Sequence, residues 1–306
     1  CTLVLSFVIN ALLRGAGEAR LSMRVLMLST ATTLLLEPVL ILGLGPLPPL
    51  GVVGSACAFV LGYGAGLMMH MALLLQGRAR IRIHLHNLRP DLPLMVQIVR
   101  IALPSTVQMA LRSSSRLAVL ALVGLYGTFA TAGYGVANRL LLMALIPCFG
   151  LGNAAGTLVG QNLGAGQPER SERSAWWVSA YAAGYMVVAA GVLTVLAPSL
   201  IALFDPTPQV VALGTQYLQV VAWSEVASAV GVVLAQSFAG AGNTVPAMGI
   251  NLFSLRRLEV AAALGLSRWL GLGITGVWWG RTLANLINGF LFALWFRRGA
   301  WKQKDV

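Results

Sequence analysis

The sequence carries little charge for its length. Of its 306 residues, 58% are hydrophobic and only 10% are Asp, Glu, Lys or Arg, and the mean hydropathy is +0.80. Soluble domains carry roughly 25% charged residues, so the shortage excludes a conventional soluble enzyme. The low polarity also excludes a disordered chain. Because about 20 apolar residues cross a bilayer, the composition predicts an all-α, polytopic transmembrane helical bundle.

Acidic residues and cysteines are also few. Nine acidic residues stand against 21 basic ones, giving a net charge of +12. The basic residues are spread thinly between apolar segments, which favours positively charged cytoplasmic loops over a nucleic-acid surface. The three cysteines, Cys1, Cys57 and Cys148, are odd in number and lie in apolar stretches. No disulfide framework is therefore expected.

Motifs of enzymatic chemistry are missing. The sequence contains no P-loop, no HExxH and no Ser/His/Asp set, and without a P-loop this chain alone does not drive pumping by ATP. His84 and His86 lack the Cys or carboxylate neighbours of a metal site. We therefore expect neither an enzyme nor a metal site, and no cofactor.

Long apolar segments predict about nine helices. They lie at 1–13, 22–44, 52–76, 94–126, 129–159, 174–197, 214–238, 246–266 and 275–296. Only the short segment Arg80–His86 alternates like a strand. The first segment has its basic residue, Arg14, after the apolar run, which is the reverse of a signal peptide. It is interpreted as the end of a helix whose first half is missing.

Basic residues alternate between the two sets of predicted connections. One set carries Arg268 alone. The other set, with the foot of the fourth helix and the C-terminal tail, carries Arg14, Arg20, Arg24, Arg78, Arg80, Arg82, Arg89, Arg100, Arg170, Arg173, Arg297, Arg298, Lys302 and Lys304. Because cytoplasmic loops are rich in Lys and Arg, this set and the C-terminus are predicted to be cytoplasmic.

Two glycine patterns recur near the two ends of the chain. Gly15–Gly17 recurs as Gly240–Gly242, each between two predicted helices, and Gly51–Gly54 recurs as Gly273–Gly276, each at the start of the next helix. Helices one to three therefore repeat as helices seven to nine. Helices four to six have no earlier counterpart, which implies that about three helices before the first are absent. Such repeats are common in secondary transporters, in which the transport path lies between two halves.

Several motifs carry a family resemblance. Leu13–Glu18 (LRGAGE) resembles the RGxGD-type loop of the multidrug and toxin extrusion (MATE) transporters, and Leu36–Gly43 resembles their LDPLLIFG segment with Glu in place of Asp. Leu50–Ala56 is similar to their LGVxGAA helix start. The most specific match is Gly152–Gly166, which reads GNAAGTLVGQNLGAG, and Gly240–Thr244 completes the pattern.

The resemblance implies a fold and a mode of action. It implies two pseudo-symmetric six-helix lobes that exchange inward- and outward-facing states and expel cationic, amphipathic compounds against Na⁺ or H⁺. Residues 1–92 would be the C-terminal part of an incomplete first lobe, three helices and the inter-lobe loop, and residues 93–306 the second lobe. The first helix of many relatives carries a coupling aspartate, which this chain does not contain.

Glu225 is the first candidate for transport or coupling. It lies in the middle of the seventh predicted helix, where a carboxylate costs at least about 2.5–3.5 kcal/mol on insertion scales. It is therefore expected to be partnered, protonated or facing water. Ser228 and Gln236 lie on roughly the same helical face, which predicts a polar stripe toward a cavity. The resemblance places the coupling aspartate of some sodium-coupled relatives at Ser228, one turn away.

The fourth predicted helix supplies the second set of candidates. Its polar face carries Ser105, Gln108, Arg112, Ser115 and Arg116, at three- and four-residue spacings. Arg112 stands where many sodium-coupled relatives have a glutamate, which argues against a copied cation site. One hypothesis is that Arg112 or Arg116 pairs with Glu225 and that substrate or proton competes for the pair. The alternative is a permanent structural ion pair.

Two other acidic residues lie within predicted helices. Glu37 precedes Pro38, and because proline removes a backbone donor and bends a helix, the pair is a candidate gating kink. Glu259 follows Arg256 by three residues, a spacing that predicts an ion pair along one helix.

Small residues recur at helical spacing in two of the predicted helices. Gly152, Gly156, Gly160 and Gly164 form one stripe, and Gly62 and Gly66 repeat the pattern. Small residues at this spacing let helix backbones approach closely in a bilayer. These glycines are therefore predicted to pack helices together, not to bind a dinucleotide.

Together with these features, the resemblance to MATE transporters implies an ion-coupled antiporter, using H⁺ or Na⁺, that exports small amphipathic organic compounds across the inner membrane. We expect it to be multi-pass and monomeric, in contact with lipid and not with nucleic acid. Two alternatives remain open. One is a lipid-linked oligosaccharide flippase, favoured by Arg112, Arg116 and Arg139. The other is a non-transporting fragment or membrane scaffold.

Overall fold

The computed structural model divides the chain into two compact units, Cys1–Asp91 and Leu92–Val306. It describes residues 2–43, 48–76 and 91–303, without the side chains of Arg112, Leu255, Arg256 and Gln303. The described residues are almost entirely helical and contain no strand, which confirms the all-α prediction. The short alternating segment Arg80–His86 lies outside the described residues.

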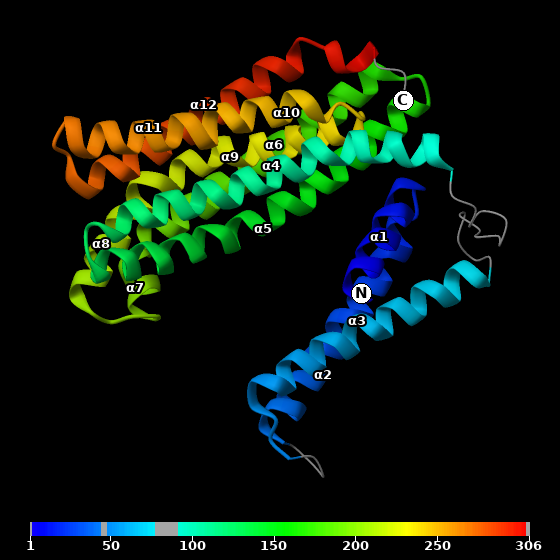
Figure 1. Cartoon of the computed structure of the whole chain (residues 1–306), viewed down its shortest axis with the longest axis horizontal. Helices are drawn as coiled ribbons and strands as arrows, with labels where there is room; N and C mark the ends of the chain where they lie inside the picture. Colours follow the sequence, from blue (N-terminus) through cyan, green and yellow to red (C-terminus); the bar gives the residue numbers. More distant parts are fainter. Residues whose placement is uncertain (1, 44–47, 77–90, 304–306) are drawn as a thin grey trace. The chain divides into compact units, whose positions relative to one another are not determined.

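Unit 1 (Cys1–Asp91) contains three helices, α1 (Thr2–Gly15), α2 (Ala19–Leu42) and α3 (Gly51–Leu75) (Figure 1). Helices α2 and α3 pack along each other because small residues of α3 meet α2. A Cβ at Gly62 would lie 2.0 Å from Thr33 Oγ1, and one at Gly66 would lie 1.9 Å from Ser29 Oγ. The predicted packing role of these two glycines is confirmed.

Unit 2 (Leu92–Val306) is a helical bundle whose long helices run alongside one another (Figure 1). Its α-helices are α4 (Leu92–Gly124), α5 (Thr128–Gly164), α6 (Pro168–Val195), α7 (Ala197–Ala202), α8 (Pro208–Val221), α9 (Glu225–Gly240), α10 (Thr244–Asn251), α11 (Glu259–Leu264) and α12 (Gly273–Arg297). Helix α5 lies at the centre of the packing, against α6, α8 and α9, and α12 packs on α9.

Two predicted helices are interrupted in the structure. The segment predicted at 214–238 is α8 and α9 joined by the 3-10 turn η2 (Ala222–Ser224). The segment predicted at 246–266 contains two π-helical stretches, η3 (Leu252–Leu258) and η4 (Gly265–Trp269), around α11. Hydropathy does not reveal such breaks, and irregular turns of this kind are frequent at functional sites. Both Glu225 and Glu259 directly follow one of them.

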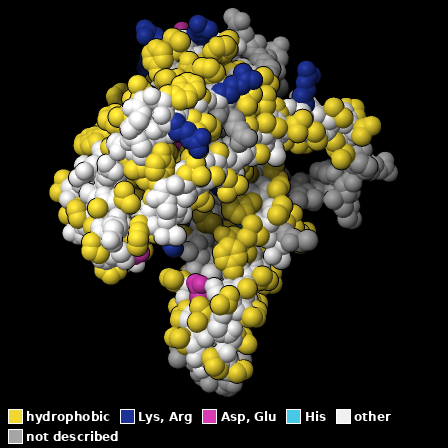
Figure 2. Space-filling model, turned by 60° about the vertical axis from the view of Figure 1, so that its left-hand side comes forward, with side chains coloured by type: hydrophobic (Ala, Val, Ile, Leu, Met, Phe, Trp, Pro, Cys, Tyr) yellow, Lys and Arg dark blue, Asp and Glu magenta, His cyan; other side chains and the backbone are white. Residues whose placement is uncertain are grey.

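The surface is that of a membrane protein. Six helices of the described chain are long and apolar enough to cross a bilayer: Ala19–Leu42, Gly51–Leu75, Leu92–Gly124, Thr128–Gly164, Pro168–Val195 and the combined segment Pro208–Gly240. Hydrophobic side chains cover most of the face shown in Figure 2, with only scattered Lys and Arg. Large contiguous apolar surface of this kind is rare in soluble monomers, so the protein is a multi-pass membrane protein.

The glycine stripe of α5 meets α9. A Cβ at Gly156 would lie 2.7 Å from the carbonyl oxygen of Gln236, and one at Gly160 would lie 2.9 Å from that of Gly240. From the other side, a Cβ at Gly240 would lie 2.0 Å from the carbonyl oxygen of Gly156. A Cβ at Gly152 would lie 3.1 Å from Gln236 Cγ. The predicted packing role is therefore confirmed for Gly152, Gly156 and Gly160, while Gly164 faces open space.

The recurring glycine pattern forms the same type of turn at both of its positions in the chain. Gly17 and Gly242 both have a left-handed backbone, with φ of 84° and 67°. In both turns the next residue donates its backbone N–H to the carbonyl five residues back, from Glu18 to Leu13 and from Asn243 to Phe238, at 2.9 Å each. This is the Schellman helix end. The sequence repeat at an offset of 225 is therefore also a structural repeat.

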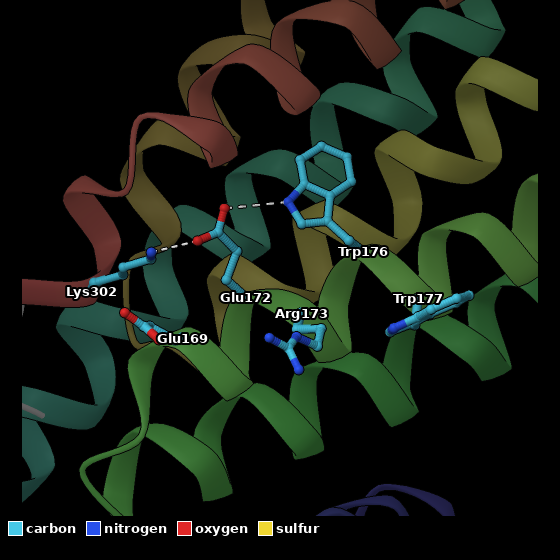
Figure 3. Close-up of a pocket in the computed structure, with 6 residues that line it drawn as sticks. All are labelled: Glu169, Glu172, Arg173, Trp176, Trp177 and Lys302. Atoms are coloured by element: carbon cyan, nitrogen blue, oxygen red, sulfur yellow. Dashed lines mark hydrogen bonds and ion pairs between the residues drawn. The ribbon is translucent and has the colours of Figure 1, made fainter.

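The C-terminal segment is fastened to the start of α6. Trp301, in the short helix η5 (Ala300–Gln303), is 1% exposed, stacks on Phe296 at 4.5 Å between ring centroids, and donates its indole N–H to the Phe296 carbonyl at 2.9 Å. Beside it, Lys302 forms an ion pair with Glu172 of α6, which also accepts a hydrogen bond from Trp176 (Figure 3). The last helix and the beginning of α6 therefore lie at the same end of unit 2.

These two contacts are expected to differ in strength. Trp301→Ala removes a buried ring and is expected to lower the free energy of unfolding by about 3–5 kcal/mol. Glu172→Gln breaks an ion pair whose side chains are 25% and 27% exposed, so a change of about 0–1 kcal/mol is expected. Thermal unfolding of the purified variants in detergent checks the order. Equal destabilisation by the two substitutions would contradict this order and show that the ion pair contributes as much as the ring.

Candidate functional site

Three charged side chains meet inside unit 2. Arg281 of α12 places Nη2 3.2 Å from Glu225 Oε1 and Nη1 3.6 Å from Glu259 Oε1. Glu225 is 3% exposed and Glu259 4% exposed. Charges buried in a membrane are kept only when they are partnered, and here one guanidinium serves two carboxylates. These three residues are called the charged trio below.

Neutral polar groups support the charged trio. The Asn285 side-chain amide, one turn beyond Arg281 on α12, donates to Glu225 Oε1 at 3.1 Å and to Ser224 Oγ at 3.0 Å. The Ser115 hydroxyl of α4 donates to Glu259. Each carboxylate therefore has a hydrogen bond besides its contact with Arg281, which lowers the free-energy cost of burying it.

A small cavity opens beside the charged trio. Its volume is about 70 Å³, and both glutamates, Arg281, Arg116 and Ser228 line it. A water molecule occupies about 30 Å³ of liquid, so the cavity is large enough for an ion or one to two waters and too small for an organic substrate. The arrangement is suited to exchanging a proton or a small cation at a carboxylate.

An aromatic cluster includes Trp278, which precedes Arg281 by three residues on α12. Tyr134, Tyr217 and Trp278 are all at most 3% exposed, with ring centroids 4.7 to 5.9 Å apart. Rings packed this way exclude solvent and strengthen the attraction between the charges beside them.

A larger groove adjoins the cavity within unit 2. It has a volume of about 570 Å³, is formed by α4, α5, α9 and α10, and shares Arg116 and Phe149 with the cavity. Gln236 lies in its wall and donates to Asn153 Oδ1 at 2.9 Å. Sites for drug-sized molecules measure about 300–1,000 Å³, so the groove has the size of a substrate site.

The structure brings most of the predicted candidates to these two places. Glu225 and Ser228 line the cavity, Gln108 and Gln236 line the groove, and Arg116 lines both. The predicted polar stripe on α9 therefore does face cavities. The side chain of Arg112 lies outside the described residues. Glu37 belongs to unit 1, where its Oε1 accepts a hydrogen bond from Ser55 at 2.7 Å.

The described ion pairs bear on two expectations from the sequence. The described partner of Glu225 is Arg281, and Arg116 makes no ion pair with Glu225 although both line the cavity. The Arg256 side chain lies outside the described residues, so its pairing with Glu259 stays a prediction, and the described partners of Glu259 are Arg281 and Ser115. Arg281 reaches both carboxylates because α12 packs against α9 and α11.

Sequence reasoning missed Arg281, although a signal was present. Arg281 is the only charged residue in the predicted helix 275–296. A lone ionisable residue in a membrane segment normally marks a functional site or an ion pair. Read together with Glu225 and Glu259, each in another apolar segment, it predicts a buried pairing but not which glutamate takes part.

Comparison with known proteins identifies the family. A family model described as MatE matches residues 104–264, more than half of the chain. The chain belongs to the MatE family. The match covers most of unit 2, including Glu225 and Glu259. The family assignment confirms the resemblance read from the motifs.

Individual relatives agree with this assignment. The chain is 28% identical to the probable multidrug resistance protein YoeA of Bacillus subtilis over 99% of its own length, and 26% identical to the probable multidrug resistance protein NorM of Thermotoga maritima over 98%. It spans 66% and 64% of the length of these two relatives. The MatE family is a family of transporters.

Solved structures show the same fold. The chain superimposes on a MOP superfamily transporter from Pyrococcus furiosus with a TM-score of 0.91 at 23% identity, covering 99% of this chain and 68% of that one. A multidrug resistance MATE family transporter in an outward-facing conformation gives 0.90, also at 23% identity. At this identity the likeness shows the fold alone: the helices are arranged as in these transporter structures.

Proposed function

We propose that the protein is an ion-coupled antiporter that exports small organic compounds by alternating access. The charged trio carries this proposal. With both carboxylates ionised, two negative charges share one positive charge in a buried site, and a single proton on either glutamate makes the trio neutral. Binding and release of one ion therefore changes the charge and the hydrogen bonds that join α9, α11 and α12.

The geometry favours H⁺ over Na⁺ as the coupling ion. Sodium prefers several oxygen ligands around one point, whereas Arg281 already occupies the space between the two carboxylates. A proton requires only one carboxylate oxygen, and both carboxylates line the cavity of about 70 Å³ together with Ser228. Protonation of Glu225 or Glu259 would loosen its contact with Arg281 and free α12 to shift against its neighbour.

The remaining assignments belong to the same proposal. We propose an inner-membrane monomer. Its C-terminus is assigned to the cytoplasm because the basic residues Arg170, Arg173, Arg297 and Lys302 occur around the joined ends of α6 and α12. No cofactor beyond the coupling ion is needed. Relatives named as multidrug resistance proteins favour drug export over the flippase alternative.

Drug export by cells tests the proposal. An efflux-deficient host that produces the protein is expected to tolerate more ethidium and norfloxacin than the host alone. Glu225→Gln and Glu259→Gln are each expected to lower the export rate at least about tenfold, because a permanently neutral side chain neither takes up nor releases the coupling proton. Arg268→Gln, at an exposed position, is the control. Full export by both glutamine variants would remove the charged trio from the mechanism.

A further inference from the structure

The larger groove of unit 2 has positive charge in its wall. Arg116 of α4 and Arg139 of α5 both line it, and both side chains are exposed. Its other lining residues are apolar or neutral and polar, and no described carboxylate is among them. The groove therefore presents two guanidinium groups to whatever molecule enters it.

Arg139 has no counter-charge in the described protein. Glu225 and Glu259, the two described carboxylates within the interior of the bundle, are both bound to Arg281. Neither Arg116 nor Arg139 forms an ion pair with any described residue. An arginine at membrane depth is costly unless it faces water or meets an anion, so these two side chains favour an anionic ligand.

The other lining residues indicate the chemical character of the remainder of that ligand. Met109, Met143, Ile146 and Phe149 lie along the groove. Methionine side chains are flexible and polarisable and adapt to rings of varied shape, and the volume of about 570 Å³ suits a molecule of drug size. By contrast, the surface pocket at the start of α6 contains Glu169 and Glu172 besides its cations, so it has no such preference.

We propose that the groove binds amphipathic organic anions, with Arg139 and Arg116 holding a carboxylate, sulfonate or phosphate and the apolar wall holding an aromatic or alkyl body. This rests on the proposed export function and adds amphipathic organic anions to its substrates. Arginine suits the task because its planar fork pairs with two oxygens of such a group. Arg139 is the principal selectivity residue, since Arg116 also faces the charged trio across the small cavity.

A matched pair of ligands tests charge selectivity. Flavin mononucleotide and riboflavin share one fluorescent ring system and differ by a phosphate, and ethidium supplies a cation. Titrated against the purified full chain in detergent, flavin mononucleotide is expected to bind at least about tenfold more tightly than riboflavin or ethidium. Arg139→Gln is expected to abolish that preference without weakening riboflavin binding. Arg139→Lys is expected to keep part of it, and Arg268→Gln all of it.

The outcomes separate the inference from the proposed function. Equal binding of the two flavins, or tighter binding of ethidium, overturns the anion site, while proton-driven export of ethidium would leave the antiporter intact. Selective binding of flavin mononucleotide without transport of any probe in proteoliposomes supports the site and contradicts export. Competition by phosphatidylglycerol, but not by phosphatidylcholine, supports the site and identifies a lipid headgroup as its occupant. Without such competition, selective binding assigns the site to soluble anions.

Discussion

Arg281→Gln is expected to lower the free energy of unfolding by about 3–5 kcal/mol, because it leaves two buried carboxylates without their shared cation. Glu225 and Glu259 are 3% and 4% exposed, so water solvates their negative charges poorly. Transport is expected to fall to the level of cells without the protein. Chemical or thermal unfolding in detergent measures the first effect, and dye export by cells measures the second.

A combined variant separates stability from transport. Arg281→Gln together with Glu225→Gln and Glu259→Gln replaces the charges by neutral amides that are able to hydrogen-bond with one another. We expect this variant to recover most of the lost stability and none of the transport. Arg268→Gln, an arginine at an exposed position outside the charged trio, is the matched control. A stable, transport-competent Arg281→Gln single variant would show that the trio is dispensable.

Gly240→Ala is expected to be the most damaging small substitution in the bundle. The added Cβ would lie 2.0 Å from the carbonyl oxygen of Gly156, and because the obstacle is backbone, α5 and α9 must move apart. A loss of at least about 1–3 kcal/mol is expected from such overpacking. The yield of folded protein in size-exclusion chromatography and the midpoint of thermal unfolding report it.

The same helix pair supplies a control. Gly150 also lies in α5, but a Cβ there would meet nothing within 4 Å. Gly150→Ala is expected to be neutral or slightly stabilising, because alanine is the better helix former. If Gly150→Ala and Gly240→Ala were equally harmful, general sensitivity of these helices, and not close approach of their backbones, would explain the loss.

The helices were largely predictable from the sequence. The fourth segment, predicted at 94–126, is α4 (Leu92–Gly124), and the ninth, predicted at 275–296, is α12 (Gly273–Arg297). Apolar length and glycine-rich turns are local properties, and a membrane enforces helices wherever they occur. The breaks at Ala222–Ser224 and Leu252–Leu258 were not predictable, because they depend on how the helices pack.

The site was also predictable only in part, because residue types are local properties and pairing depends on packing. Glu225 and Ser228 stood out because polar residues are rare in apolar segments, and the structure places both at the cavity. The identity of the partner required tertiary packing: Arg281 lies 56 residues from Glu225 in sequence and reaches it only because α12 packs on α9. Arg116 lies on the predicted polar face of α4 and lines the cavity and the groove, but it forms no ion pair with Glu225.

Coupled movement of protons and organic solute is the central claim, and internal pH measures it most directly. Proteoliposomes containing the protein and a trapped pH-sensitive dye are prepared with an acidic lumen, and a transported compound is added outside. We expect uptake of the compound with a simultaneous rise of internal pH, and neither in Glu225→Gln or Glu259→Gln. Uptake that proceeds equally fast without a pH gradient and leaves the internal pH unchanged would contradict proton coupling at the charged trio.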